Sequence, residues 1–289
     1  LPRDRLEVLP DLERALDRGL ELTPGGGELV VLPTYTAMLA LRTAVDRVRR
    51  RGSEPVAEPT WWQPADAPPP DALPAEAPPT GRLPADARPT HYRLSLTAMP
   101  QQPRFAGTVD IDVTLDRPRD VIWLHGRGLT VKQVALQAPG VAPIAARWEQ
   151  ATPAGVAAVR LPFPVGPGNV ALHIDYDAPF SENGDGFSHV TREGKSYGFT
   201  QFESIFARQA FPCFDEPAFK TPYDITIFAP QGQEATSNAR EVERAPAASG
   251  LTRFTFATTA KLPSYLVAFA VGPLDIVNAP PIPPNAVRK

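Results

Sequence analysis

Strict alternation of apolar and polar residues is the feature that most constrains how this chain can fold. Tyr92, Leu94 and Leu96 alternate with polar residues, and so do the apolar residues within 109–115 and 170–176. A period of two places apolar side chains on one face of a β-strand and polar ones on the other. Further strands are predicted where short runs of apolar and β-branched residues lie between Pro/Gly turns, at residues 121–125, 129–136, 156–161, 223–228 and 252–256.

The arrangement of these predicted strands indicates the fold class. No long amphipathic helix separates them, so the chain is predicted to be mainly β, with an antiparallel β sandwich or a saddle of sheets. Residues 264–271, SYLVAFAV, are apolar almost throughout and predict a strand buried on both faces. The Gly-rich residues 181–198 are expected to form a loop.

The segment before the predicted strands has a different composition. Prolines recur among Ala, Glu and Asp through residues 53–82, and such a sequence favours a semi-rigid, extended linker. Residues 1–52 show two helical patterns around the short apolar run 28–32, which predicts a helix-strand-helix segment. The β domain is then expected to span residues 83–284.

Composition and charge narrow the classes of partner. The 289 residues carry a formal net charge of -3 and 43% hydrophobic residues, enough for a large core and about two domains. The chain is slightly acidic and has no stripe of basic residues of the kind that binds nucleic acid, so nucleic acid is not expected as a partner. Cys213 is the only cysteine, which rules out an internal disulfide and a cysteine-based zinc site, and it is expected to be a small buried hydrophobe.

The first residues of the chain bear on its predicted compartment and on whether it is a fragment. Leu1 stands where an initiating Met would, which predicts a fragment or a processed chain. The first twenty residues lack the apolar centre of a signal peptide, and no run of about 18 apolar residues predicts a membrane span. A cytoplasmic location is favoured, with a periplasmic or secreted one left open.

The chemically densest stretch is FTQFESIFARQAFPCFDEPAFK, at residues 199–220. Its carboxylates could form a general acid/base pair, or they could fix the loop by pairing with Arg208 and accepting backbone N–H bonds. The structural interpretation is favoured for Asp215 and Glu216, because carboxylates so close in sequence need a third group to hold them together. On the residues alone, Glu203 would also be a capping residue or a partner of Arg208.

Four segments resemble, in order, the N-terminal β domain of the aminopeptidase N family of zinc metallo-aminopeptidases. They are LPADARPTHYRLSL (83–96), FAGTVDIDV (105–113), YGFTQFESIFARQAFPCFDEPAFKTPYDITIFAP (197–230) and LPSYLVAFAVGPLDIV (262–277). The resemblance implies that Glu203, two residues after the Gln of a TQxE motif, binds the free α-amino group of a peptide. It also implies that Gln201 lines the pocket for the first side chain. A carboxylate bound to an ammonium makes a short, charge-assisted hydrogen bond, which suits this role.

The metal chemistry of that family has no counterpart in the sequence. Zinc hydrolysis there needs HExxH on a helix and a downstream Glu. None of the four histidines is followed by Glu or lies four residues from another: His91, His125, His173 and His189. No catalytic and no metal-binding residue is therefore predicted here. Zinc is expected in a missing catalytic domain that would begin near residues 285–289.

These expectations define two functional hypotheses. The first is a substrate-gating domain of a zinc aminopeptidase, truncated before its catalytic domain, with the peptide N-terminus as its partner and no activity of its own. The alternative is a stand-alone β sandwich without enzymatic activity that binds a protein or peptide through an exposed sheet edge.

The N-terminal segment carries a second, shorter resemblance. VLPTYTAMLALR (31–42), within residues 11–51, is similar to the extreme C-terminal end of Mur-ligase-like proteins of lipid II amidation. The P-loop of that family, GxxxxGK[ST], does not occur in the chain, so its ATP chemistry is not expected. An αβα piece that packs on another part is the favoured interpretation.

Overall fold

The computed structural model describes residues 76–277. The chain divides into two compact units, Leu1–Leu73 and Pro74–Lys289, and only the second contains described residues. The predicted helix-strand-helix segment, the first part of the predicted linker and residues 285–289 lie outside the described residues, so those predictions stay predictions. The described part is mainly β, which confirms the predicted fold class.

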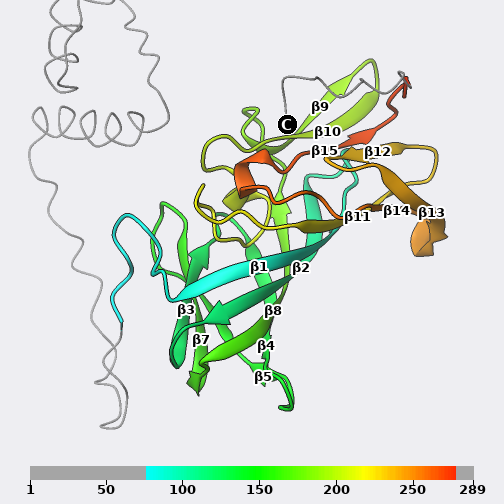
Figure 1. Ribbon diagram of the computed structural model, residues 1–289. Coiled ribbons are helices and arrows are strands. Elements are labelled where there is room, and N and C mark those ends of the chain that lie inside the picture. The colour runs from blue at the N-terminus through cyan, green and yellow to red at the C-terminus, as the bar shows by residue number, and fades with distance from the viewer. Residues whose placement is uncertain (1–75, 278–289) are drawn as a thin grey trace, which may run out of the picture. The chain divides into compact units, whose positions relative to one another are not determined.

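The largest element is an eight-stranded sheet with the order β13-β14-β11-β1-β2-β8-β4-β5. Neighbouring strands are antiparallel except β1 and β11, which run parallel with Tyr92 opposite Tyr223. In Figure 1, β1, β2, β8 and β4 lie side by side in the lower part of the view. The strands are β1 (Ala87–Thr97), β2 (Arg104–Leu115), β4 (Thr130–Gln137), β5 (Ile144–Ala145), β8 (Gly168–Pro179), β11 (Tyr223–Pro230), β13 (Glu241–Ala247) and β14 (Leu251–Phe256).

Two smaller sheets complete the described part. A four-stranded sheet has the order β12-β15-β10-β9, and a three-stranded sheet has the order β3-β7-β6. The strands are β12 (Glu234–Ser237), β15 (Phe269–Gly272), β10 (Lys195–Gln201), β9 (Gly186–Arg192), β3 (Arg119–His125), β7 (Val156–Val165) and β6 (Arg147–Gln150). Short 3-10 helices lie between strands, at η2 (Ala207–Gln209), η3 (Ala248–Gly250) and η4 (Ser264–Leu266).

The alternation in the sequence maps directly onto burial. Along β2, Val109, Ile111 and Val113 are buried while the residues between them are partly exposed, and β8 and β11 show the same pattern. The inward side chains of all three sheets form one hydrophobic core. Because a one-residue slip would turn every apolar side chain outward, this burial also fixes the strand register.

Two predictions about local structure were wrong. Residues 181–198 contain the β9–β10 hairpin rather than only a loop, and its turn uses Glu193 and Gly194 with φ of 53° and 75°. Positive φ at both turn residues matches the twist of paired strands, so the glycine closes a hairpin. Residues 264–271 are not one continuous strand, because Ser264 begins the 3-10 turn η4 and β15 starts only at Phe269.

Candidate functional site

Aromatic side chains anchor the stretch at residues 199–220. Phe202, directly after β10, is buried and contacts Phe211 and Phe269 edge-on, with ring centroids 5.9 Å apart in both pairs. Phe211 in turn lies edge-on to Tyr92 and Tyr223, which stack on each other across β1 and β11. These contacts fix the stretch against both the four-stranded and the eight-stranded sheet.

Gln201 and Glu203 lie on either side of Phe202, and both are exposed. The side-chain carbonyl of Gln201 accepts a hydrogen bond from the backbone N–H of Glu203 at 3.0 Å, which holds the first residue of the turn. The peptide bond between Glu203 and Ser204 is cis. Within residues 76–277, no hydrogen bond or ion pair engages the Glu203 carboxylate.

Arg208 pairs with Asp215 and not with Glu203. Its Nε lies 2.8 Å from Asp215 Oδ2, and its Nη2 donates to the backbone carbonyl of Asp215 at 3.1 Å. Nη1 donates to the carbonyl of Ala154 at 3.2 Å. Both side chains are buried, and a buried ion pair is tolerated when its remaining donors and acceptors are also satisfied. The guanidinium therefore joins η2 to the loop before β11.

Two residues that the sequence did not point to complete this network. Ser264, at the start of η4, donates from Oγ to Asp215 Oδ1. His125, at the end of β3, accepts the backbone N–H of Asp215 at Nδ1, over 3.1 Å. Burial, together with the nearby positive charge of Arg208, lowers the pKa of His125 to about 3. His125 is therefore neutral at physiological pH, as an acceptor at Nδ1 requires.

Glu216 has a separate partner from Asp215. Its Oε1 accepts the backbone N–H of Leu83 at 2.6 Å. The two neighbouring carboxylates therefore bind different parts of the domain, and each contact holds the loop in place.

Cys213 and Tyr92 lie beneath the same loop. Cys213 is fully buried, which confirms the expectation of a small buried hydrophobe, and burial raises the pKa of its thiol well above the usual value. The hydroxyl of Tyr92 accepts the backbone N–H of Phe214 at 3.0 Å. The Cys213 side chain therefore packs in the core, and the Tyr92 hydroxyl supplies a hydrogen-bond acceptor for a buried backbone N–H.

The histidines of the described region are all engaged. His91 contacts Asp224 at 2.9 Å, His173 contacts Asp110 at 2.7 Å, and His189 contacts the carbonyl of Pro100 at 2.8 Å. Within residues 76–277, no group of three or more His, Cys, Asp or Glu side chains is placed to hold a metal ion. The zinc that the resemblance implies thus has no ligand set in the part of the chain that the structure describes.

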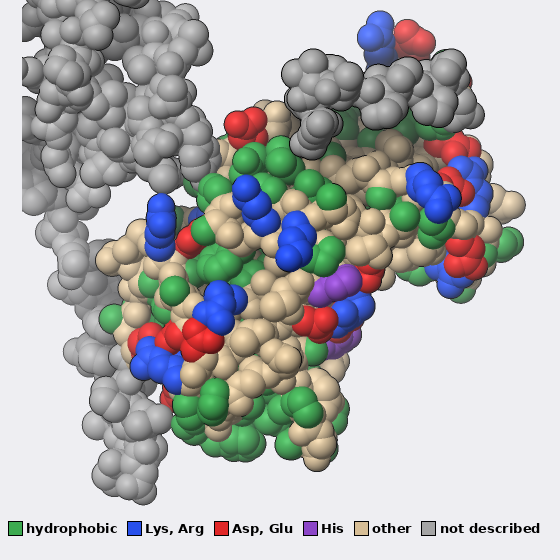
Figure 2. Space-filling view, in the orientation of Figure 1, with side chains coloured by type: hydrophobic (Ala, Val, Ile, Leu, Met, Phe, Trp, Pro, Cys, Tyr) green, Lys and Arg blue, Asp and Glu red, His purple; other side chains and the backbone are tan. Residues whose placement is uncertain are grey.

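Ion pairs cover the outer face of the eight-stranded sheet. Arg93 pairs with Asp112 through both of its terminal nitrogens, beside the histidine pairs already described. Figure 2 shows acidic, basic and histidine side chains next to one another on the face in view. Among the described residues, no helix is long and apolar enough to cross a membrane.

Comparison with known families now places the chain. The family model of the Peptidase M1 N-terminal domain matches residues 88–266, which is more than half of the chain. The chain belongs to this family. The matched region contains all of the candidate site: Gln201, Glu203, Arg208, Asp215 and Glu216.

Curated relatives are aminopeptidases. The chain is 35% identical over 197 residues to the puromycin-sensitive aminopeptidase of Caenorhabditis elegans, covering 66% of this chain and 21% of the relative. It is 33% identical over 205 residues to endoplasmic reticulum aminopeptidase 1 of Homo sapiens, covering 65% and 21%. It is 29% identical over 192 residues to aminopeptidase N of Acetobacter pasteurianus, covering 65% and 53%. The chain thus spans about a fifth of the length of the first two relatives.

Proposed function

We propose that the β domain gates substrate for a zinc aminopeptidase by binding the free N-terminus of a peptide. Glu203 accepts the α-ammonium group, and Gln201 lines the pocket for the first side chain. The observation that carries this proposal is the exposed Glu203 carboxylate, which has no partner within residues 76–277 although it lies on a turn fixed by buried neighbours.

The surroundings of Glu203 suit such a contact. A carboxylate contributes most to binding affinity when it is held in place before the ligand arrives, because less conformational entropy is then lost on binding. Phe202 is buried directly before Glu203, and the backbone N–H of Phe206 donates to the carbonyl of Phe202 at 3.0 Å, which closes the turn around it. The buried pair of Arg208 and Asp215 then fixes the end of this turn.

The bond-breaking chemistry is assigned to another part of the enzyme. The described residues offer no zinc ligand set, and the matched relatives extend well beyond the region that this chain covers. The purified chain, incubated with zinc and an aminoacyl chromogenic substrate, is accordingly expected to give no turnover. Robust turnover that a chelator abolishes would contradict this assignment.

A chimera tests the role of Glu203. Residues 76–277 replace the matched region of the Caenorhabditis elegans relative, and hydrolysis of the same substrate is measured. Loss of one charge-assisted hydrogen bond in Glu203→Gln is expected to lower kcat/KM by about 10- to 100-fold, mainly through KM. Glu193→Gln, at the exposed tip of the β9–β10 hairpin, makes the same charge change and is expected to have no effect.

The outcome also separates the two functional hypotheses. If the Glu203→Gln and Glu193→Gln chimeras hydrolyse the substrate equally fast, Glu203 does not bind the amine. A domain that binds partners through a sheet edge, without a role in gating, would then be favoured.

A further inference from the structure

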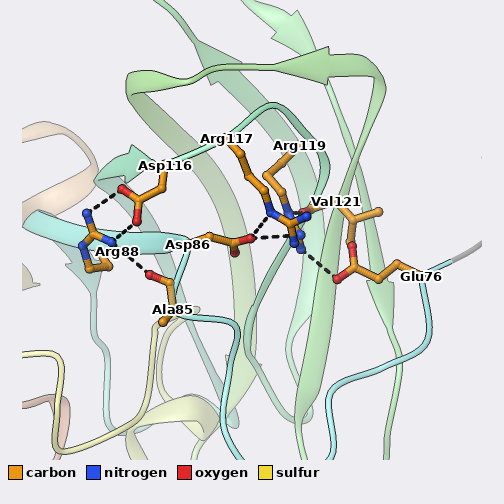
Figure 3. Close-up of polar contacts among 8 residues, drawn as sticks. All are labelled: Glu76, Ala85, Asp86, Arg88, Asp116, Arg117, Arg119 and Val121. Carbon is orange, nitrogen blue, oxygen red and sulfur yellow. Dashed lines mark hydrogen bonds and ion pairs between the residues drawn. The ribbon is translucent and has the colours of Figure 1, made fainter.

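An N-terminal strap, defined as residues 76–86, lies directly before β1 and is held on the domain at several points. Figure 3 shows its two acidic residues, Glu76 and Asp86, directed toward the arginines that precede and begin β3. Arg119 Nη2 donates to Glu76 at 2.9 Å, and Arg119 Nη1 donates to Asp86 at 3.3 Å. Arg117 makes a second ion pair with Asp86.

Arg119 is the centre of this attachment. Its side chain is only 5% exposed, and its Nε donates to the carbonyl of Val121 at 3.2 Å. A buried guanidinium needs its carboxylate partners, because an uncompensated charge there is strongly unfavourable. The backbone carbonyl of Asp86 also accepts the N–H of Asp116 at 2.8 Å. The strap is therefore fixed at Glu76 to the first residue of β3, and at Asp86 also to the turn between β2 and β3.

Between these ends, the strap touches the candidate site. The side chain of Leu83 is buried, and its backbone N–H donates to Glu216 Oε1 at 2.6 Å. Glu216 directly follows Asp215, whose carboxylate binds Arg208. Through the backbone of the strap and these contacts, Glu76 is thus linked to Arg208 in η2, which directly follows the turn that carries Glu203.

We infer that the strap positions the site loop, and that the contact between Leu83 and Glu216 couples the two. The strap precedes residue 88, where the family match begins, and its partners Arg119 and Glu216 lie within the matched region. The coupling concerns the position of the loop and holds whether or not Glu203 binds an amine. Glu76 and Glu216 are positioning residues in this scheme.

Hydrogen–deuterium exchange of the full chain tests the coupling in both directions. Glu216→Ala removes the acceptor of the Leu83 N–H and is expected to speed exchange in residues 76–86 by about tenfold, which is the loss of about 1.4 kcal/mol. Glu76→Ala removes the ion pair at the other end of the strap. It is expected to speed exchange in residues 199–220, with which Glu76 has no direct hydrogen bond or ion pair. Coupling between two sites is reciprocal, so both effects are required.

Conservative variants and a distant control separate positioning from general destabilisation. Glu216→Gln and Glu76→Gln keep a side-chain acceptor and are expected to restore most of the protection. Glu243→Gln, which breaks an exposed ion pair with Arg253 on β13 and β14, is expected to leave residues 76–86 and 199–220 unchanged. Unaltered exchange of residues 199–220 in Glu76→Ala would overturn the inference, and so would an equal increase across the β13–β14 hairpin.

Discussion

Acidification should destabilise this domain through His125 in a pH range where carboxylates contribute little. The folded pKa of His125 is about 3, because burial and Arg208 oppose its charged form, whereas the unfolded value is 6.5. When a group has a lower pKa in the folded chain than in the unfolded chain, a fall in pH protonates it in the unfolded chain first. Its contribution to stability is therefore fully present above pH 6.5 and is lost as the pH falls toward 3.

The size of the effect follows from the two pKa values. Between them the unfolded chain binds one proton that the folded chain does not, so the free energy of unfolding falls by about 1.4 kcal/mol per pH unit. Between about pH 7.5 and about pH 5 the loss from His125 comes to about 2 kcal/mol. Carboxylates with lowered pKa values, such as Asp177, add their losses only at lower pH.

Urea unfolding at several pH values, followed by circular dichroism, measures this loss. His125→Asn keeps a side-chain acceptor for the N–H of Asp215 and removes the titration, so the wild-type chain should lose about 2 kcal/mol more than the variant over that range. His173 is the matched control with the opposite sign. Burial lowers the pKa of His173, but the hydrogen bond and charge of Asp110, with Asp175, outweigh burial and raise it.

A raised pKa gives stability at low pH that is lost as the pH rises, so His173→Asn should lose more on acidification than the wild-type chain. Parallel pH profiles for the wild-type and His125→Asn proteins would refute the reasoning about His125, because they would mean that His125 titrates equally in both states.

Three further outcomes can be checked on the purified chain. Asp215→Asn leaves the buried Arg208 without its carboxylate and should lower the free energy of unfolding by about 3–5 kcal/mol. Asp112→Asn, at an exposed ion pair, should lower it by less than about 1 kcal/mol. Urea unfolding of both variants measures the difference. Phe202→Ala should cost about 3–5 kcal/mol by the same assay, because it empties a buried site between two aromatic rings, and a loss below 1 kcal/mol would contradict that packing. Cys213 should react with a thiol-directed chromogenic reagent only on unfolding, since its thiol is buried and its pKa is raised; rapid labelling of the folded chain would contradict this burial.

Strands with one buried and one solvent-exposed face were predictable, because successive side chains of a strand point to opposite faces and the sequence then alternates between apolar and polar residues. Residues 92–96, 109–115 and 170–176 all fall within strands, and the apolar members are the buried ones. The β9–β10 hairpin was missed because its glycines resemble a loop in the sequence, and only positive φ at the turn reveals their use. Residues 264–271 were misjudged because continuous apolar character does not distinguish a strand from a buried 3-10 turn followed by one.

The candidate site was predictable in its residue types and not in its contacts. The sequence left open which acid pairs with Arg208, because chain neighbours can be held apart by the tertiary structure. His125 and Ser264 reach Asp215 from 90 and 49 residues away, and nothing in their local sequence marks them. The contact of Glu216 with Leu83 spans 133 residues and has no local signal either.

The parallel pairing of β1 with β11 sets the order in which the domain can be completed during synthesis. β1 ends at Thr97, while its parallel partner begins only at Tyr223, so β1 leaves the ribosome well before β11. At bacterial or eukaryotic elongation rates the delay is on the order of ten seconds. During that time β1 can pair with β2, but the backbone N–H and C=O groups of its other edge stay unpaired, and an open edge is a template for association with other chains. The edge of β1 is therefore covered only after β11, which ends at Pro230, has been made.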